Sequence, residues 1–255
     1  MFHGRFFICA DIHGDAQVVK NLIAQVPNPN EEDTIIVCGD AGFEYGYVNS
    51  TAAKRAARKF PGNWIVLRGN HDSCYWKDHE DDPDWDILEG IGGADLLFEN
   101  IYPNILYVKD SGGIYNFGGL NFLMLPGAYS VDKAYRLRNR LPYNEDEQLD
   151  DNTMLELYQI VDQWNRQRFN IDYVIGHTFP KFMEPYFRDL FFSGIDQRFV
   201  DKRTEMWLSD MANLYEGNRA FKQYYGGHFH DSRTMGQYYT MVYHKLVELE
   251  GYNER

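Results

Sequence analysis

The first third of the chain alternates short apolar runs with segments in which apolar residues recur at helical spacing. Runs rich in β-branched and aromatic residues predict three buried strands, at 5–10, 34–38 and 64–67. Helical spacing predicts a helix over 18–26, which Pro27 ends. It predicts a second helix over about 50–60, with Asn49 or Ser50 as its N-cap. This strand–helix order predicts parallel strand pairing through helical crossovers.

The rest of the chain carries the same alternation in a less regular order. Helices are predicted from about 151 and over 204–215, and strands at 173–175, 221–225 and 239–247. Between 105 and 125, glycine pairs at 112–113 and 118–119 break strand-like runs and predict hairpins. The acidic stretch 78–86 predicts an exposed loop or lid. No repeat or linker interrupts the chain, so we expect residues 1–255 to form a single α/β domain of two packed sheets flanked by helices.

Charge and composition exclude some kinds of binding partner. The chain has 255 residues and a net charge of −13. Such a surface repels long duplex DNA, whereas a small nucleotide, a short oligonucleotide or a phosphoprotein remains compatible. No apolar run approaches the roughly 18–20 residues that span a bilayer, so we expect no membrane association. Cys9, Cys38 and Cys74 follow no disulfide spacing, which favours a reducing, cytoplasmic location.

Polar residues with metal-binding side chains follow five of the predicted strands. These segments are Asp11-Ile12-His13, Gly39-Asp40, Gly69-Asn70-His71-Asp72, Gly176-His177 and Gly227-His228-Phe229-His230. In open α/β sheets, functional sites gather at the carboxyl ends of the strands. The five segments are therefore expected to converge on one site.

The spacing within the motifs has a physical reason. In extended backbone, residues i and i+2 face the same side. Asp11 with His13, and His228 with His230, are therefore each expected to present two ligands to one site. Glycines beside the ligands let the chain turn without a Cβ clash. Carboxylate, imidazole and amide groups suit Mn²⁺, Fe or Zn²⁺, and the lack of a ligand-like cysteine argues against a thiolate site.

In this order, the five motifs resemble those of the calcineurin-like metallophosphoesterases, from about Phe6 to His230. The segment 127–132 (GAYSVD) further resembles the small bacterial and phage branch of that family. The resemblance implies a four-layer α/β/β/α sandwich of two mixed sheets and two divalent cations, Mn²⁺ first, with Fe, Zn²⁺ or Mg²⁺ as alternatives. It assigns one cation to Asp11, His13, Asp40 and His230. It assigns the other to Asp40, Asn70, His177 and His228, so that Asp40 bridges the two.

The resemblance also implies that His71 is a non-ligand histidine that faces the scissile phosphate. Many protein-phosphatase relatives continue the second motif as G-D-x-x-D-R-G, in which the second Asp orients this histidine and the Arg grips the phosphate. Here Phe43 replaces that Asp, and no Arg occurs in 39–46. Both losses argue against a standard Ser/Thr protein phosphatase, although the segment 67–71 (LRGNH) resembles that branch. Asp72 is then favoured over Glu44 as the partner of His71, although Asp72 would serve equally well as a cap.

Further candidates lie outside the ligand set. Arg136, Arg138 and Arg140 are candidates for contact with substrate phosphate, and solvated surface positions explain them equally well. Asp15 is expected to be an N-cap, and His244 is expected at the surface or in packing. Aromatic residues near the motif loops are expected to pack rather than stack on a base. These are Tyr45, Tyr47, Tyr75 and Trp76.

The predicted function is metal-dependent hydrolysis of a phosphoester, with a phosphodiester or nucleotide as the favoured substrate. Two cations about 3.5–4 Å apart would clamp the phosphate and lower the pKa of a bridging water, and the hydroxide would attack phosphorus in line. His71, as imidazolium, would protonate the leaving oxygen. The alternatives are a phosphomonoesterase, including a Ser/Thr-type protein phosphatase, and a non-catalytic scaffold. The scaffold ranks last because every ligand is present.

Overall fold

The computed structural model describes residues 2–44, 50–90, 94–191 and 195–249. Seven strands form the first sheet: β1 (Phe6–Cys9), β2 (Thr34–Val37), β3 (Asn63–Val66), β4 (Trp85–Leu88), β5 (Leu96–Glu99), β6 (Ile105–Tyr107) and β13 (Val247–Glu248). Their order across the sheet is β13-β1-β2-β3-β6-β5-β4. The central neighbours from β1 to β6 pair in parallel, as the strand–helix alternation predicts.

Six strands form the second sheet: β7 (Gly113–Phe117), β8 (Leu120–Leu125), β9 (Tyr173–Gly176), β10 (Gln223–Gly226), β11 (Arg233–Met235) and β12 (Tyr239–Met241). Their order is β11-β12-β10-β9-β8-β7. β8, β9, β10 and β12 pair in parallel, and antiparallel strands close both edges. Both sheets are therefore mixed.

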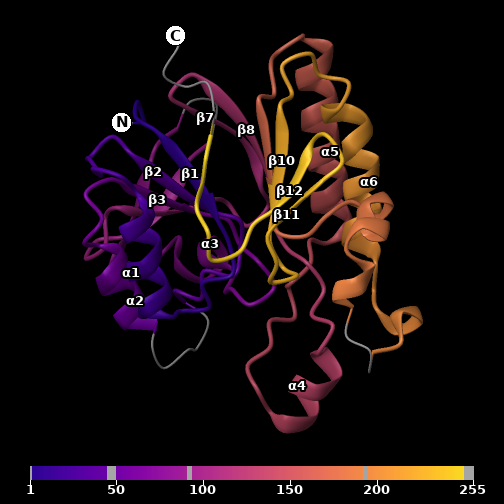
Figure 1. The fold of residues 1–255 in the computed structure, drawn as a ribbon, viewed down its shortest axis with the longest axis horizontal. Helices are drawn as coiled ribbons and strands as arrows, with labels where there is room; N and C mark the ends of the chain where they lie inside the picture. The colour runs from indigo at the N-terminus through magenta and orange to yellow at the C-terminus, as the bar shows by residue number, and fades with distance from the viewer. Residues whose placement is uncertain (1, 45–49, 91–93, 192–194, 250–255) are drawn as a thin grey trace.

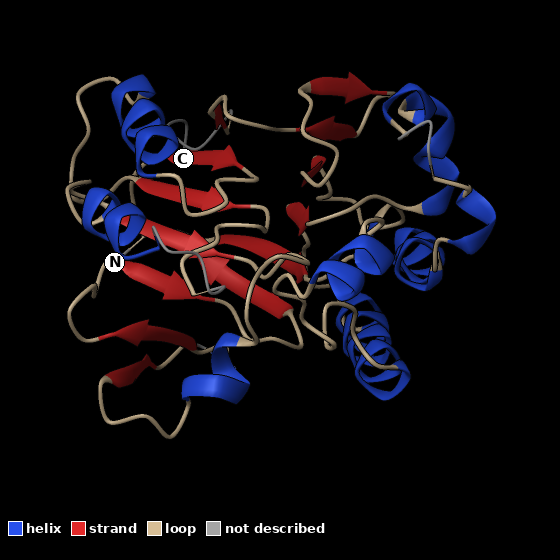
Figure 2. Ribbon diagram, turned by 90° about the horizontal axis from the view of Figure 1, so that it is seen from below, coloured by secondary structure: helices blue, strands red, loops and turns tan. Residues whose placement is uncertain are grey.

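Helices cover the outer faces of the two sheets. The α-helices are α1 (Ala16–Gln25), α2 (Ser50–Ala57), α3 (Tyr75–His79), α4 (Lys133–Asn139), α5 (Asp151–Arg166) and α6 (Arg203–Tyr215). Short 3-10 turns lie at η2 (Lys181–Tyr186), η3 (Arg188–Leu190) and η4 (Gln197–Phe199). Figure 1 shows α1 and α2 against the first sheet and α5 and α6 against the second. Seen from below in Figure 2, helices again lie on the outer sides of the strands.

Side chains alternate between two cores along each central strand. On β1, Phe7 and Cys9 point into the core shared with α1 and α2, whereas Phe6 and Ile8 point into the core between the sheets. A third core joins the outer face of the second sheet to α5 and α6. Because these strands are covered on both faces, they appear in the sequence as continuous apolar runs. The α/β/β/α sandwich is thereby confirmed.

The predicted first helix has the cap that its sequence suggests. The Asp15 carboxylate accepts hydrogen bonds from the backbone N–H groups of Gln17 and Val18, at 2.7 and 3.3 Å. These bonds satisfy two of the free donors at the start of α1. The alternative cap of the second helix, Asn49, lies outside the described residues, and α2 begins at Ser50.

The predicted strand over 239–247 is wrong in its extent. β12 ends at Met241 in the second sheet, and β13 begins at Val247 in the first sheet, where it pairs with β1. The intervening residues 242–246, which we call the crossing segment, carry the chain from one sheet to the other. Alternation of apolar and polar residues does not reveal such a change of sheet, because both flanking pieces are extended.

Two further predictions need correction. Only the 118–119 glycine pair makes a hairpin turn, between β7 and β8. The pair at 112–113 instead lies where the chain passes from β6 in the first sheet to β7 in the second. The acidic stretch 78–86 is not one loop, since its ends belong to α3 and to the edge strand β4. A stacked pair of rings, His79 on Trp85 at 4.3 Å between centroids, holds the two ends together.

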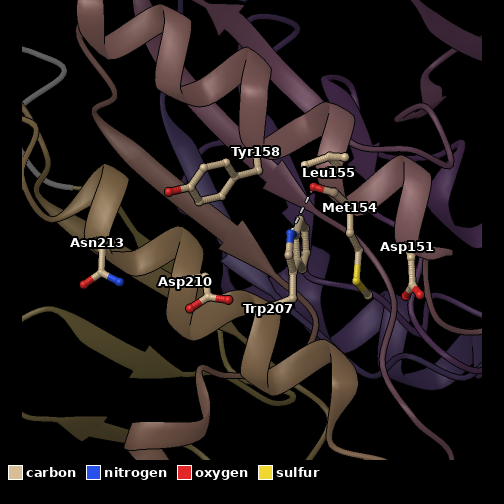
Figure 3. A pocket seen from close by; sticks show the side chains of 7 residues that line it. All are labelled: Asp151, Met154, Leu155, Tyr158, Trp207, Asp210 and Asn213. Atoms are coloured by element: carbon tan, nitrogen blue, oxygen red, sulfur yellow. Dashed lines mark hydrogen bonds between the residues drawn. The ribbon is translucent and has the colours of Figure 1, made fainter.

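A cavity of about 360 Å³ lies between α5 and α6. Trp207 is one of the residues that line it, and its indole N–H donates to the carbonyl oxygen of Met154 at 3.1 Å (Figure 3). None of the residues that line it belongs to a metal motif. Among the described residues, no helix is long and apolar enough to cross a bilayer.

Candidate metal centre

The five motifs meet between the two sheets, at the carboxyl ends of their parallel strands. Asp11, Asp40 and Asn70 follow strands β1, β2 and β3 of the first sheet, whereas His177 and His228 follow β9 and β10 of the second. Each sheet therefore supplies part of one constellation.

The inner part of the constellation is centred on the Asn70 side-chain oxygen. This oxygen lies 2.8 Å from Nε2 of His177 and 3.0 Å from Nδ1 of His228. The same His177 nitrogen lies 3.3 Å from Oδ1 of Asp40. Three of these residues are deeply buried, with Asp40, Asn70 and His177 at most 2% exposed.

The outer part is more open to solvent. Nε2 of His13 lies 3.0 Å from Nε2 of His230, and the latter atom lies 3.7 Å from Oδ1 of Asp11. Nδ1 of His13 is 3.9 Å from Oδ2 of Asp40, so Asp40 faces both parts. The His230 side chain is 49% exposed, which leaves this side of the centre accessible to a substrate.

The backbone at five of the seven candidate ligands is left-handed, so the extended geometry expected from the sequence for the pairs at 11 and 13 and at 228 and 230 is wrong. Positive φ angles occur at Asp11 (58°), His13 (51°), Asp40 (54°), His228 (73°) and His230 (53°). Left-handed backbone costs about 1–2 kcal/mol per non-glycine residue, and such strain gathers at functional sites. Each strand ends just before its motif, and tight left-handed turns, rather than strand alternation, aim both ligands of a pair at one point.

Two glycines are needed here for different reasons. Gly39 has φ of +85°, and a Cβ there would lie 2.3 Å from Nδ1 of His177. A Cβ on Gly69 would lie 2.1 Å from Oδ1 of Asp40. Gly69 therefore serves close approach of two chain segments and not a turn.

Several outer contacts fix the orientation of the candidate ligands. Nδ1 of His177 lies 2.8 Å from the Cys38 carbonyl oxygen, so a proton on Nδ1 leaves Nε2 free to face Asp40 and Asn70. The Asn70 amide nitrogen donates to the Ser130 hydroxyl at 2.9 Å, which turns its oxygen toward the histidines. Ser130 was not identified as a site residue, although it lies in the segment GAYSVD that carried part of the family resemblance.

Asp72 is fully buried and acts on the backbone of two motif loops. Its Oδ1 accepts from the N–H of Gly42 at 2.8 Å, and its Oδ2 accepts from the N–H of Gly69 at 2.9 Å. Each carboxylate oxygen is thus engaged in holding a loop that carries a candidate ligand. The competing carboxylate, Glu44, forms an ion pair with Lys54.

The buried carboxylates at the inner part are stabilised by positive charge. Burial opposes a charge on His177, yet the nearby carboxylates of Asp40 and Asp11 outweigh it and raise the pKa of His177 to about 9. Burial raises the pKa of Asp11, with His177 opposing the shift. Asp40 is also buried, but the histidines around it hold its pKa well below the usual range. Two buried carboxylates this close are stable only with a cation or proton between them.

The histidines from the last motif are held neutral. Burial lowers the pKa of His230 to about 4, with His13 adding to the shift. Burial also lowers the pKa of His228, and His177 lowers it further. Neutral imidazole is the form that binds metal ions, so these rings are prepared to act as ligands near neutral pH.

The donor set fits two divalent cations. Ligand atoms lie within 4.8 Å of one another in two groups, Asp11 with His13 and His230, and Asp11 with Asp40 and His177. Asn70 and His228 adjoin the second group through the contacts above. Carboxylate, amide and imidazole donors without thiolate suit Mn²⁺, Fe and Zn²⁺.

His71 lies at the rim of this centre, beside Arg136. The ring centroids of His71 and His13 are 5.5 Å apart, and the His71 backbone N–H donates to Oδ1 of Asp40 at 2.8 Å. Nη2 of Arg136 lies 3.4 Å from Nε2 of His71. Arg138 is on the same helix, α4, but is exposed to solvent.

The crossing segment contributes contacts that the sequence did not suggest. The Tyr243 ring stacks on His230, with centroids 5.2 Å apart, and on His244, at 3.8 Å. Nε2 of His244 lies 2.8 Å from the carbonyl oxygen of Asp11. His244 is therefore a packing residue of the metal centre. It belongs to no motif, and no sequence signal places it here.

The aromatic residues near the motif loops divide in two. Tyr75 and Trp76 are buried in the core shared with α1 and α2, as expected, whereas Tyr45 and Tyr47 lie outside the described residues.

Fold and donor set together define a metallophosphoesterase. The family model for calcineurin-like phosphoesterases matches residues 4–232 of the chain. The protein belongs to this family and is a metal-dependent phosphoesterase. A search of curated proteins found no match.

Two solved structures are similar to the chain at low sequence identity. Phosphopantetheinyl hydrolase from Mycobacterium tuberculosis shares 14% identity with a TM-score of 0.46, over 95% of this chain and 90% of that one. A protein of unknown function from Aquifex aeolicus shares 15% identity with a TM-score of 0.34, over 68% of this chain and 77% of that one. At this level of similarity, neither structure supports a conclusion about substrate or mechanism.

Proposed function

We propose that the protein hydrolyses a phosphodiester, in a nucleotide or a short oligonucleotide, with two Mn²⁺ ions as the first choice of metal. The proposal rests on one observation: Asp40 faces His13 in the outer part of the constellation and His177 in the inner part, at 3.9 and 3.3 Å. Asp40 is therefore the proposed bridging ligand. The other proposed ligands are Asp11, His13 and His230 for one ion, and Asn70, His177 and His228 for the other.

The chemistry divides between the cations and the chain. When bound, the two cations would act as Lewis acids that polarise the phosphate and a water molecule. The chain fixes the ligands before substrate arrives: the backbone N–H groups of Gly42 and Gly69 donate to Asp72, and the Asn70 amide donates to Ser130. Such preorganisation avoids the cost of rearranging dipoles during the reaction.

His71 is the proposed proton donor to the leaving oxygen. Burial lowers its pKa, Asp40 opposes that shift, and Arg136 adds to it. The free protein therefore favours neutral imidazole near pH 7, in contrast to the imidazolium expected from the sequence. Because a nearby anion raises the pKa of an imidazole, the bound phosphate would favour protonation of His71. Asp72 is proposed as a positioning residue and not as a proton carrier.

The preference for a diester follows from the small number of cationic donors near the centre. Arg68 is buried and donates to the Asp146 carbonyl oxygen at 2.6 Å, so it is engaged away from the ligands. Arg136 donates from Nε to Asp132 at 2.8 Å and from Nη1 to the Pro142 carbonyl oxygen at 3.1 Å. The remaining nitrogen, Nη2, provides one cationic donor, which suits the single charge of a diester better than the near-double charge of a monoester.

The second candidate is a phosphomonoesterase, including a protein phosphatase, and the position of Arg136 beside His71 is what favours it. The test compares kcat/KM for bis-p-nitrophenyl phosphate and p-nitrophenyl phosphate at equal Mn²⁺ and pH. Asp40→Asn, prepared in parallel, measures contaminating activity. A clear advantage for the monoester would reject the diesterase and leave the phosphomonoesterase.

We also propose that the chain is one domain and acts in the cytoplasm. The single domain is supported by three hydrophobic cores, one between the two sheets and one between each sheet and its helices. The cytoplasmic location is supported by Cys9, Cys38 and Cys74, which are free thiols buried in the protein, as expected in a reducing compartment. Mass spectrometry of protein alkylated after denaturation, without reductant, should find all three thiols modified.

A further inference from the structure

Residues 127–147, which we call the arm, leave the body after β8 and return to it before α5. They carry α4, which projects away from the four layers at the bottom of Figure 1. Helix α4 buries none of its residues. A seven-residue helix is marginal in water by itself, so a partner that covers α4 would stabilise it.

The arm is the wall of the metal centre on the His71 side. Three consecutive residues of the third motif each contact it: Asn70 through Ser130 (2.9 Å), His71 through Arg136 (3.4 Å) and Asp72, by its carbonyl oxygen, through Asn144 (3.0 Å). A substrate at the metal centre therefore lies beside α4, and any part of it that extends past His71 reaches the arm.

The outward leg and helix of the arm are cationic in an acidic protein. Residues 127–141 carry four Lys or Arg residues and one carboxylate, whereas the whole chain has a net charge of −13. The carboxylate, Asp132, is bound by Arg136. The return leg, 142–147, adds Glu145, Asp146 and Glu147; Asp146 pairs with Lys77, and Glu147 is buried. Lys133 lies over the rings of Tyr143 and Tyr129, at 4.8 and 5.8 Å. Arg138 and Arg140 extend into solvent.

Apolar and aromatic side chains are interleaved with these cations. Tyr135 is 61% exposed, Leu137 56% and Leu141 42%. Tyr135 and Arg138 are three residues apart on α4 and hence lie on the same side of the helix. A cationic strip with an exposed aromatic ring is the combination that binds single-stranded nucleic acid, because bases stack on the ring while phosphates meet the cations.

We propose that the arm binds the nucleotides that flank the scissile phosphodiester of a single-stranded oligonucleotide. Arg138 and Arg140 contact flanking phosphates, and Tyr135 stacks on a base. The proposal rests on the phosphodiesterase function above and narrows its substrate class. An oligonucleotide carries one charge at every linkage, so it supplies charge to both arginines at the same time as it occupies the metal centre.

Two other occupants explain the arm less well. A phosphorylated side chain brings its charge to the metal centre and supplies none of its own to Arg138 and Arg140. A second copy of the chain, joined by a two-fold axis through this surface, would bring two cationic strips together. Both occupants are outcomes of the tests below.

The first test measures binding of a fluorescein-labelled octathymidylate, with phosphorothioate linkages to slow cleavage, to the Mn²⁺-loaded protein by fluorescence anisotropy. The arm variant is Arg138→Gln/Arg140→Gln. The matched control is Arg166→Gln/Arg219→Gln, which also removes two exposed positive charges. Arg166 is at the C-terminal end of α5, and Arg219 precedes β10. The arm variant should bind several-fold more weakly. Its slope of log Kd against log salt should be shallower by about 1.4, as expected for two lost phosphate contacts on a single strand, and the control should match the wild type. Tyr135→Ala should weaken binding without changing the slope.

The second test separates the arm from the proposed function. The ratio of kcat/KM for unmodified octathymidylate to that for bis-p-nitrophenyl phosphate should fall in the arm variant and not in the control. If bis-p-nitrophenyl phosphate is not hydrolysed, the phosphodiesterase function fails, and anisotropy still decides whether the arm binds the oligonucleotide. Equal binding by the arm variant and the control overturns the proposal for the arm. Preferential binding of a phosphoserine peptide, or dimerisation in sedimentation that the arm variant abolishes, also overturns it.

Discussion

Side chains at the metal centre combine ligand chemistry with tolerance of an unusual backbone. Asp and His are enriched among the few non-glycine residues that adopt positive φ, and five of the eight such positions in the described chain carry candidate ligands. At these five positions the backbone turns sharply within a few residues of the end of its strand. The strain is retained because carboxylates and imidazoles from both sheets must meet at one point.

Substitution of Asp40 and of His177 should differ in the number of metal ions lost. Asp40→Asn should impair both sites, because its two oxygens face His13 and His177. His177→Ala should mainly empty the inner site. Elemental analysis at saturating Mn²⁺ should give about two ions per chain for the wild type and about one for His177→Ala. Asp210→Asn, an exposed carboxylate on α6, is the control; a wild type with no more than one ion would refute the dinuclear proposal.

His71 should be separable from the ligands. His71→Ala should keep its metals and lose turnover by about 10²–10⁴-fold, the usual contribution of a general acid. The metals should be retained because the backbone N–H of residue 71, which donates to Asp40, remains in the variant. Metal content should be measured on the same sample. Loss of metal would reassign His71 as a ligand, and full activity would show that the leaving group needs no proton donor.

Contacts at both ends of the strands hold the metal centre in place. At the carboxyl ends, the crossing segment joins β12 to β13 and packs His244 against Asp11. At the amino ends, Asp33 accepts hydrogen bonds from the Arg5 side chain at 3.0 and 2.7 Å and from the Asn30 backbone at 3.0 Å. Its carbonyl oxygen also receives the N–H of Asn63. One residue thereby ties together the starts of β1, β2 and β3.

Asp33 should give part of the stability a defined pH dependence. Burial alone would raise its pKa, but the bonds from Arg5 and Asn30 outweigh burial and lower it. The ionised form therefore stabilises the fold above the unfolded pKa of about 3.9, and this contribution is lost as pH falls through the folded value.

In urea unfolding, Asp33→Asn should be less stable than the wild type near pH 7 by about 1.5–3 kcal/mol, the usual worth of hydrogen bonds to a charged group. The difference should shrink as the pH falls below about 3.9. Glu31→Gln, an exposed carboxylate in the same turn, should change little at any pH. A difference for Asp33→Asn that did not vary with pH would contradict the assignment.

At the scale of the whole molecule, the centre is an interface between two sheets. The first sheet supplies the carboxylates, His13 and Asn70, and the second supplies His177, His228 and His230. Cations held between the two sheets would link them in the folded state alone. The buried carboxylates Asp11 and Asp40 also repel each other unless positive charge lies nearby.

Metal removal should therefore lower the thermal stability of the whole protein. Binding to the folded state alone adds about 2.7 kcal/mol for each site at a free ion concentration 100 times its Kd. Calorimetry should show a lower Tm after EDTA treatment and recovery with added Mn²⁺. Asp40→Asn should show a smaller response than Asp210→Asn. An unchanged Tm after verified removal of metal would contradict this coupling.

Local patterns in the sequence were enough to predict the central strands of both sheets, the helices α1, α2, α5 and α6, and the candidate ligands, but not the strands β4, β5 and β11. Apolar runs mark strands covered on both faces, and metal chemistry restricts ligands to few residue types, so both leave local signals. Asp15 was recognisable as a cap for the same reason, since its bonds reach only two and three residues ahead.

Features that depend on contacts between distant segments are visible only in the folded protein. The strand predicted at 239–247 divides between two sheets because pairing partners, not local pattern, determine where a strand belongs. Five of the seven candidate ligands adopt left-handed backbone because strands from both sheets end around one point. Arg136 reaches His71, and His244 reaches Asp11, across 65 and 233 positions of the chain. Such contacts leave no periodic signal in a sequence, since they form only when the two sheets have packed.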